Sequence, residues 1–83
     1  MRVGYTAAAV ANLDEFSRDV QERILGKVCF YAEQKNPLRF AKHLAGYNAY
    51  RFRVGIYRVL FEIQGDTLLI LKIMKRDKAY KDI

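Results

Sequence analysis

The N-terminal part of the chain carries apolar side chains at steps of three and four, which is the spacing of one buried helix face. This spacing predicts a helix over residues 7–16 and a second helix after Ser17, a favourable N-cap residue. The second helix is expected to end before Pro37, because a proline pushes the residue before it out of the helical conformation. The two segments therefore predict a helical hairpin.

The C-terminal half instead alternates apolar and polar residues with a period of two, which is typical of strands. Residues 47–54 and 57–63 are separated only by Gly55 and Ile56, and a two-residue loop with glycine first predicts a β-hairpin. Residues 67–74 form a third predicted strand. Its expected apolar face consists of Leu69, Leu71 and Ile73.

Three segments lie outside these elements. Residues 1–6 predict a short edge strand, residues 38–46 a turn-rich or helical connector, and residues 75–83 a charged tail or short helix. The predicted fold class is α+β, in a single domain spanning residues 1–83. An N-terminal strand and a two-helix hairpin precede a three-stranded antiparallel meander. The helices pack on one face of the sheet and leave the other face partly open.

Composition limits what this domain can be. With 52% hydrophobic and 13% aromatic residues, the chain can form a compact core. No apolar run approaches the roughly 18 residues of a membrane span, and no signal-peptide pattern opens the chain, so we expect a cytoplasmic protein without a membrane partner. Cys29 lies between Val28 and Phe30 and is expected to be a buried, small apolar side chain. One cysteine and one histidine, His43, are too few for an ordinary zinc or iron site, so neither metal nor cofactor is expected.

The positive charge is concentrated in one window. Residues 34–61 contain six basic residues and no Asp or Glu, while the remaining 55 residues hold nine basic and nine acidic residues. The net charge of +6 therefore comes from this window alone, and the isoelectric point is near 9.7. Such an excess indicates a polyanion or an acidic protein as partner. The six basic residues are Lys35, Arg39, Lys42, Arg51, Arg53 and Arg58.

The predicted hairpin brings three of these cations together. Arg51 and Arg53 share one face of the first strand, and the tight turn places Arg58 of the second strand near Arg53. One interpretation is a solvated polar face, because a half-covered sheet keeps its polar side chains outward. The other is an anion site, because neighbouring like charges without acids cost stability.

Two stretches of the sequence resemble the RelE/ParE superfamily of bacterial and archaeal toxins. Residues 44–47 read LAGY, and residues 50–60 read YRFRVGIYRVL. They are similar to the superfamily's leucine-x-glycine-tyrosine motif and to its tyrosine-arginine-x-arginine-valine-glycine-x-tyrosine-arginine motif. Element order, length and basic charge are similar over essentially the whole chain. The motifs are specific for the superfamily and much less so for the activity within it.

The resemblance implies a toxin that is paired with a cognate antitoxin, whose acidic C-terminal segment binds it. The RelE branch cleaves messenger RNA in the A site of the 70S ribosome, in contact with ribosomal RNA and without a metal. A ribose 2′-hydroxyl attacks the adjacent phosphate and leaves a 2′,3′-cyclic phosphate. This chemistry requires a base, cations that stabilise the charge of the transition state, and an acid for the departing 5′-oxygen.

By position in the motifs, the resemblance implies catalytic roles for Arg58, Arg76 and Tyr80. Lys75 stands where many relatives have a histidine, and it could act as the base if neighbouring cations lower its pKa. Tyr80 takes part only if the C-terminal segment folds back onto the sheet.

Arg51 and Arg53 match a basic pair on the first hairpin strand, where similar RelE-type sites often carry lysines. Arginine is a poor proton acceptor because its pKa exceeds about 12, so a phosphate-clamp role suits both residues better than that of a base. Arg39 and Lys42 are candidates for phosphate contacts or ordinary surface cations. His43 is expected in the connector or facing ribosomal RNA.

Three functions are consistent with this sequence. The leading hypothesis is the ribosome-dependent endoribonuclease. A ParE-like poison of DNA gyrase without nuclease activity is the first alternative, and an inactive relative that only binds its antitoxin is the second.

Overall fold

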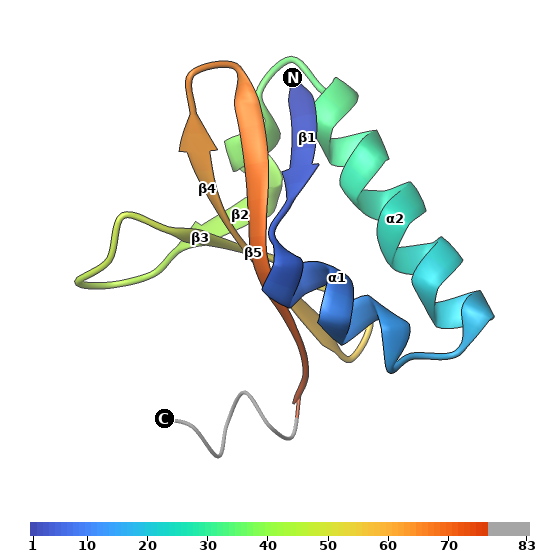
Figure 1. Cartoon of the computed structure of the whole chain (residues 1–83). Helices are drawn as coiled ribbons and strands as arrows, with labels where there is room; N and C mark the ends of the chain where they lie inside the picture. Colours follow the sequence, from blue (N-terminus) through green and yellow to red (C-terminus); the bar gives the residue numbers. More distant parts are fainter. Residues whose placement is uncertain (77–83) are drawn as a thin grey trace.

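The computed structural model describes residues 1–76, which form one mixed sheet with helices α1 and α2 on the same side of it (Figure 1). The strand order is β1-β5-β4-β3-β2, with β1 parallel to β5 and the other pairs antiparallel. The predicted α+β class, with its helices on one sheet face, is confirmed. In chain order the elements are β1 (Arg2–Tyr5), α1 (Ala7–Asp14), α2 (Arg18–Glu33), the 3-10 helix η1 (Pro37–Phe40), β2 (Ala41–His43), β3 (Tyr50–Val54), β4 (Tyr57–Gln64) and β5 (Thr67–Lys75).

Both helices begin at the residues that their capping chemistry favours. The hydroxyl of Thr6 accepts a hydrogen bond from the backbone N–H of Ala9 at 3.1 Å, and that of Ser17 accepts one from Val20 at 3.3 Å. Helix α2 ends at Glu33, ahead of Pro37 as predicted. In the part of the chain that the structure describes, no helix is long and apolar enough to cross a membrane.

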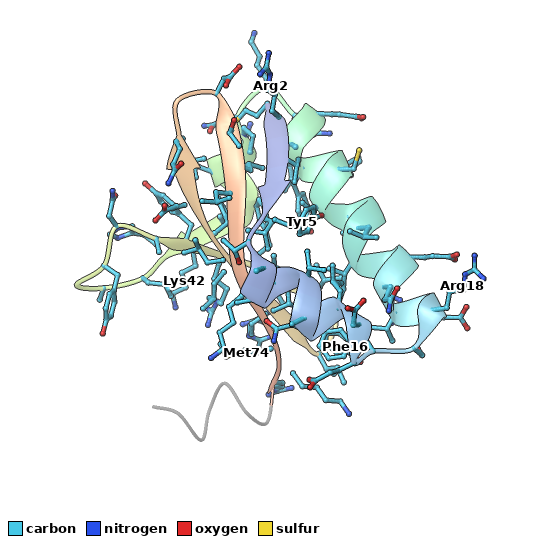
Figure 2. All side chains as sticks on the ribbon, in the orientation of Figure 1. Arg2, Tyr5, Phe16, Arg18, Lys42 and Met74 are labelled. Carbon is cyan, nitrogen blue, oxygen red and sulfur yellow. The ribbon has the colours of Figure 1, made fainter. Side chains whose placement is uncertain are left out.

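The core lies between the helices and one face of the sheet. Helix α2 contributes Ile24, Val28 and Ala32, which follow one another at steps of four and are almost completely buried. The ring of Phe52 on β3 is fully buried and stacks on Phe61 of β4, with 4.2 Å between ring centroids. Tyr5 also packs against this core, and its burial is the main reason why the pKa of its hydroxyl is raised (Figure 2).

The prediction that Cys29 is buried is wrong. Cys29 is exposed, because one residue along a helix turns the side chain by about 100° and so carries it away from the stripe that contains Val28. Its thiol donates a hydrogen bond of 3.5 Å to Oε1 of Glu33. This hydrogen bond, together with the negative charge of Glu33, raises the pKa of Cys29.

The predicted turn-rich or helical connector over residues 38–46 begins in the 3-10 helix η1 but also contains a strand that was not predicted. Strand β2 pairs with β3, so that Ala41 lies opposite Phe52 and Lys42 opposite Arg51. Residues 44–49 form the loop between these strands, in which Gly46 has a φ of +80°, and β3 therefore begins at Tyr50 rather than three residues earlier. A three-residue strand is too short to show alternation in the sequence.

The predicted apolar face of the third strand is also only partly right. Leu60 pairs with Lys72 and Phe61 with Ile70, so Leu71 is an extra residue that forms a bulge in β5. The bulge shifts the alternation, and the core side chains of β5 are Leu68, Ile70 and Ile73. The hydroxyl of Thr6 donates a hydrogen bond of 2.8 Å to the carbonyl oxygen of Leu71, which stabilises the bulge.

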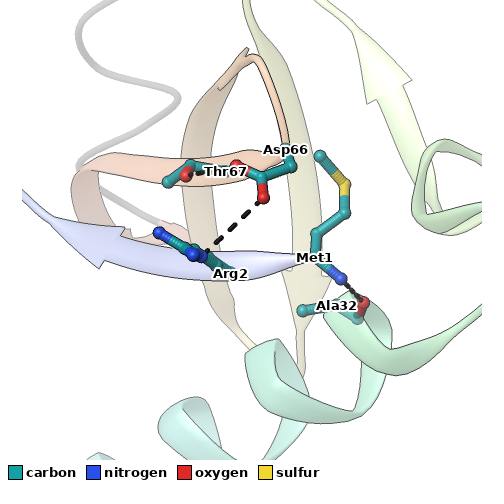
Figure 3. A network of polar contacts seen from close by, with 5 residues as sticks. All are labelled: Met1, Arg2, Ala32, Asp66 and Thr67. Carbon is teal, nitrogen blue, oxygen red and sulfur yellow. Dashed lines mark hydrogen bonds and ion pairs between the residues drawn. The ribbon is translucent and has the colours of Figure 1, made fainter.

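The first strand is fastened at its N-terminal end (Figure 3). The backbone N–H of Arg2 donates to the carbonyl oxygen of Asp66 at 2.9 Å, and the side chains of these residues form an ion pair at 3.7 Å. The amino group of Met1 donates to the carbonyl oxygen of Ala32 at 2.9 Å. These contacts join β1 to the β4–β5 turn and to the end of α2.

Candidate nucleic-acid interface

The sheet register separates an apolar face from a basic face, as the alternation predicts. Arg53 lies opposite Arg58 and Arg51 opposite Leu60, while Phe52 and Val54 face the core. The hairpin turn has the predicted form, because Val54 pairs with Tyr57 and Gly55 has a φ of +58° that a side chain would disfavour. We call the sheet face away from the helices the outer face; the basic residues that its register places there are Lys42, Arg51, Arg53, Arg58 and Lys72.

A pocket of about 270 Å³ opens on this outer face, and we call it the sheet pocket. All four residues that were predicted to contact phosphate border it: Arg39, Lys42, Arg51 and Arg53. Their positions follow from the short elements that precede the hairpin. The 3-10 helix η1 begins at Pro37 and carries Arg39, and β2 then places Lys42 beside Arg51 in the ladder. Figure 2 shows Lys42 on the side of the sheet away from α2.

The sheet pocket is strongly positive. Among residues 1–76, no carboxylate lies within 4 Å of the charged nitrogens of Lys42, Arg51 or Arg53, and the exposed ion pairs of Arg2 and Arg18 are formed on other elements. Glu62 is the nearest acid along β4 on the outer face, and it accepts a hydrogen bond from Gln64. Several neighbouring cations without acidic residues create a positive potential that favours the binding of an anion between them.

Arg58 does not lie where the sequence suggested. It was expected on an open polar face, but it is only 2% exposed. It stands on the outer face between Arg53 of β3 and Met74 of β5, in the middle of the sheet. Because an arginine stays charged when it is buried, Arg58 is a fixed positive charge beneath the exposed cations.

The other predicted catalytic residues lie at the far end of β5. Lys75 pairs with Tyr57, whose ring faces the core, so the register directs Lys75 to the opposite face from Arg58. Lys75 borders a separate pocket of about 230 Å³ between α1 and β5, together with Asn12 and Glu15. The structure therefore does not bring Lys75 together with the sheet pocket.

Arg76 follows directly on β5, beside the hairpin turn. Its backbone N–H donates a hydrogen bond of 2.6 Å to the carbonyl oxygen of Ile56, so its main chain lies next to the end of the ladder that holds Arg53 and Arg58. Tyr80 lies outside the described residues. His43 pairs with Tyr50 at the edge of the sheet, and their rings are 5.1 Å apart.

The sequence reasoning missed Phe40, which borders the sheet pocket between its basic residues. The ring is 45% exposed, although aromatic rings are usually covered. A signal was available: Phe40 lies between Arg39 and Lys42, which repeats the interleaving of aromatic and basic residues seen in the hairpin.

A small α+β domain with a basic sheet face, on which residues 1–76 place no α-helix, is the class of protein that these observations define. Residues 3–80 match the family described as the ParE toxin of the type II toxin–antitoxin system, parDE. The chain belongs to this family of toxins.

Comparison with individual proteins agrees with the family. The chain is 31% identical to toxin RelE3 of Methanocaldococcus jannaschii, over 96% of both sequences. Its fold is similar to that in the RelB–RelE antitoxin–toxin complex of Methanococcus jannaschii, with a TM-score of 0.73 and 27% identity over 96% of this chain and 98% of the other. It is also similar to the RelBE2 toxin–antitoxin complex of Mycobacterium tuberculosis, with a TM-score of 0.77 and 25% identity over 90% of each chain. The chain is thus a homologue of RelE, and both of these solved relatives are complexes with an antitoxin.

Proposed function

We propose that this toxin inhibits translation by cleaving messenger RNA in the ribosomal A site. The observation that supports this proposal most directly is the sheet pocket, where Arg39, Lys42, Arg51 and Arg53 converge without a neighbouring acid among the described residues. A phosphodiester backbone supplies the negative charges that such a pocket lacks. The RelE homology supplies the expectation of nuclease activity.

In the proposed reaction the 2′-hydroxyl attacks the phosphorus that follows it, and the bond to the 5′-oxygen breaks. Arg51 and Arg53 bind the scissile phosphate. Arg51 is half-exposed and Arg53 is exposed, so both side chains reach solvent. The buried Arg58 stabilises the charge that develops on the phosphate oxygens, because a preorganised cation costs no rearrangement during the reaction.

The proton transfers fall to residues at the end of the chain. The 2′-hydroxyl proton passes to a base and the departing 5′-oxygen takes a proton from an acid. Tyr80 remains our candidate for orienting or protonating a reacting oxygen, and Arg76 for stabilising the charge of the transition state. We keep Lys75 as the candidate base only for a complex in which the end of β5 reaches the bound RNA, since the register turns its side chain toward the other face.

Two macromolecular partners follow from this proposal. A cognate antitoxin with an acidic C-terminal segment would neutralise the outer face, as suits a surface with four converging cations. The 70S ribosome, through messenger and ribosomal RNA, is the second partner. Both would compete for the same positive charges.

The test is to express the chain in growing cells and to map the 5′ ends of messenger RNA on translating ribosomes. We expect new 5′ ends at A-site codons, with 2′,3′-cyclic phosphates on the upstream fragments. Intact messages at doses that stop growth would exclude the proposed reaction.

A second function has support from one observation, the match of residues 3–80 to the ParE family. In that case the same basic face would bind DNA gyrase or its DNA, and the protein would have no nuclease activity of its own. Growth arrest with DNA-damage signalling and undisturbed messenger RNA would identify this alternative.

A further inference from the structure

Phe40 separates two basic pockets. One is the sheet pocket, and the other is a pocket of about 230 Å³ where α2 gives way to η1, which we call the helix-end pocket. Phe40 and Arg39 border both of them, so a ligand that fills both must cross these two side chains. The helix-end pocket is lined by Gln34, Lys35, Asn36, Arg39 and Phe40.

The ring of Phe40 is exposed and also held in place. It stacks on Tyr31, with 5.2 Å between centroids and 21° between ring planes, and Phe30 contacts it edge-on at 6.4 Å. Tyr31 in turn lies 4.6 Å from the core ring of Phe52. A ring with one face supported and the other edges open to solvent is a preformed stacking surface, because little rotational freedom is lost when a flat ligand binds.

The charges around this ring indicate the ligand. Lys35 stands on one side of Phe40, Lys42 stands on the other, and Arg39 is shared. Residues 34–61 contain no acid. An apolar partner surface would not require cations on both sides of the ring, and an acidic peptide would not require a flat ring between the cations. Single-stranded nucleic acid requires both, since its phosphates bind cations and its bases stack on aromatic rings.

We propose that Phe40 is a stacking platform for one base of single-stranded RNA, and that the strand runs from the sheet pocket across Phe40 into the helix-end pocket. Arg39 holds the phosphate next to the stacked base, and Lys35 and Lys42 hold the phosphates on either side. This inference rests on the proposed function, and it extends the substrate site beyond the scissile phosphate.

The experiment titrates the purified full chain with a fluorescent single-stranded hexaribonucleotide. Phe40→Leu keeps apolar contact with Tyr31 but removes the flat ring, and we expect it to weaken binding about tenfold. The matched control is Phe30→Leu, because Phe30 is 49% exposed and touches the same rings but borders neither pocket. It should change affinity less than twofold. The salt dependence should be the same for both variants, since neither removes a charge.

A hexaribonucleotide without bases tests the stacking directly. The unchanged protein should bind it more weakly by the same factor, and Phe40→Leu should then have no further effect. Equal affinity of Phe40→Leu and the unchanged protein for the normal hexanucleotide would overturn the inference. So would an equal loss in both leucine variants, or an equal loss of polyglutamate binding in Phe40→Leu, which would indicate an acidic protein site.

The stacking platform and the proposed cleavage of messenger RNA can be refuted independently of each other. Oligonucleotide binding needs no ribosome and no cleavage, so a Phe40-dependent affinity supports the inference even if messenger RNA in cells stays intact. Conversely, if the protein cleaves messenger RNA at A-site codons while Phe40→Leu binds the hexanucleotide normally, the cleavage stands and the stacking platform is wrong.

Discussion

Arg58 offers a test that separates chemistry from folding, because it is a buried cation next to an exposed one. Arg58 is 2% exposed, whereas Arg53 across the ladder is exposed. We compare two substitutions. Arg58→Met retains most of the volume of the side chain without its charge, and Arg58→Ala removes both the volume and the charge.

The expected effect on cleavage is the same for both variants. If Arg58 stabilises charge in the transition state, its loss lowers the single-turnover rate about 10²-fold or more, which corresponds to roughly 3 kcal/mol. Ribosome affinity should change much less, because the exposed cations of the sheet pocket remain.

The expected effects on stability differ. Truncating a large buried side chain to alanine costs about 2–5 kcal/mol, and for a domain of this size each kcal/mol lowers the melting temperature by about 4–8 °C. Arg58→Ala should therefore melt about 10 °C or more below the unchanged protein. Arg58→Met should melt above Arg58→Ala, because methionine retains most of the buried side-chain volume and leaves a smaller cavity.

The assay measures single-turnover cleavage on programmed ribosomes and thermal unfolding by circular dichroism for each variant. A folded Arg58→Met that cleaves at the wild-type rate would falsify the catalytic role of Arg58. Arg58 would then serve the fold alone.

Three further predictions address the basic face, the core and the thiol. Arg53→Gln should lower the log–log salt slope of ribosome binding by about 0.7–0.9, since one phosphate contact is lost. Arg18→Gln makes the same charge change on α2, and equal slopes for the two variants would show that only net charge matters. Phe52→Ala should lower the free energy of unfolding in urea by about 3–5 kcal/mol, because its ring is fully buried and stacked; a loss below 1 kcal/mol would contradict this packing. Glu33→Gln should lower the raised pKa of Cys29, so that more thiolate is present at a given pH and iodoacetamide reacts faster with the folded protein. An unchanged pH profile of alkylation would argue against the contact with Glu33.

The elements that could be predicted are those that are determined by residues within the element itself or directly beside it. The β3–β4 hairpin follows from alternation and from a glycine at the turn position that requires a positive φ, and the register at Val54 and Tyr57 confirms it. The start of α2 follows from one capping hydroxyl. The bulge at Leu71 could not be predicted, because its carbonyl oxygen is bonded by Thr6, a residue 65 positions earlier.

The sequence predicted which basic residues form the candidate site, but not the strand that brings them together or the burial of Arg58. The acid-free window identified all four basic residues of the sheet pocket, yet nothing in the sequence indicated that β2 exists and sets Lys42 beside Arg51. Alternation assigned Arg58 to the correct face of the sheet. It could not indicate how deeply the side chain lies, because burial depends on which residues from other parts of the chain pack against it.

The buried arginine bears on the choice between nuclease and gyrase poison. A surface that only binds a polyanion needs cations that reach solvent, and Arg53 and its neighbours around the sheet pocket meet that need. Arg58 is 2% exposed, so it adds little to the binding of a polyanion at the surface. A catalytic role is consistent with a buried cation, because a preorganised charge stabilises the transition state most strongly where water is excluded. Loss of toxicity in a folded Arg58→Met therefore favours the nuclease, whereas full toxicity in that variant favours the binding-only alternative.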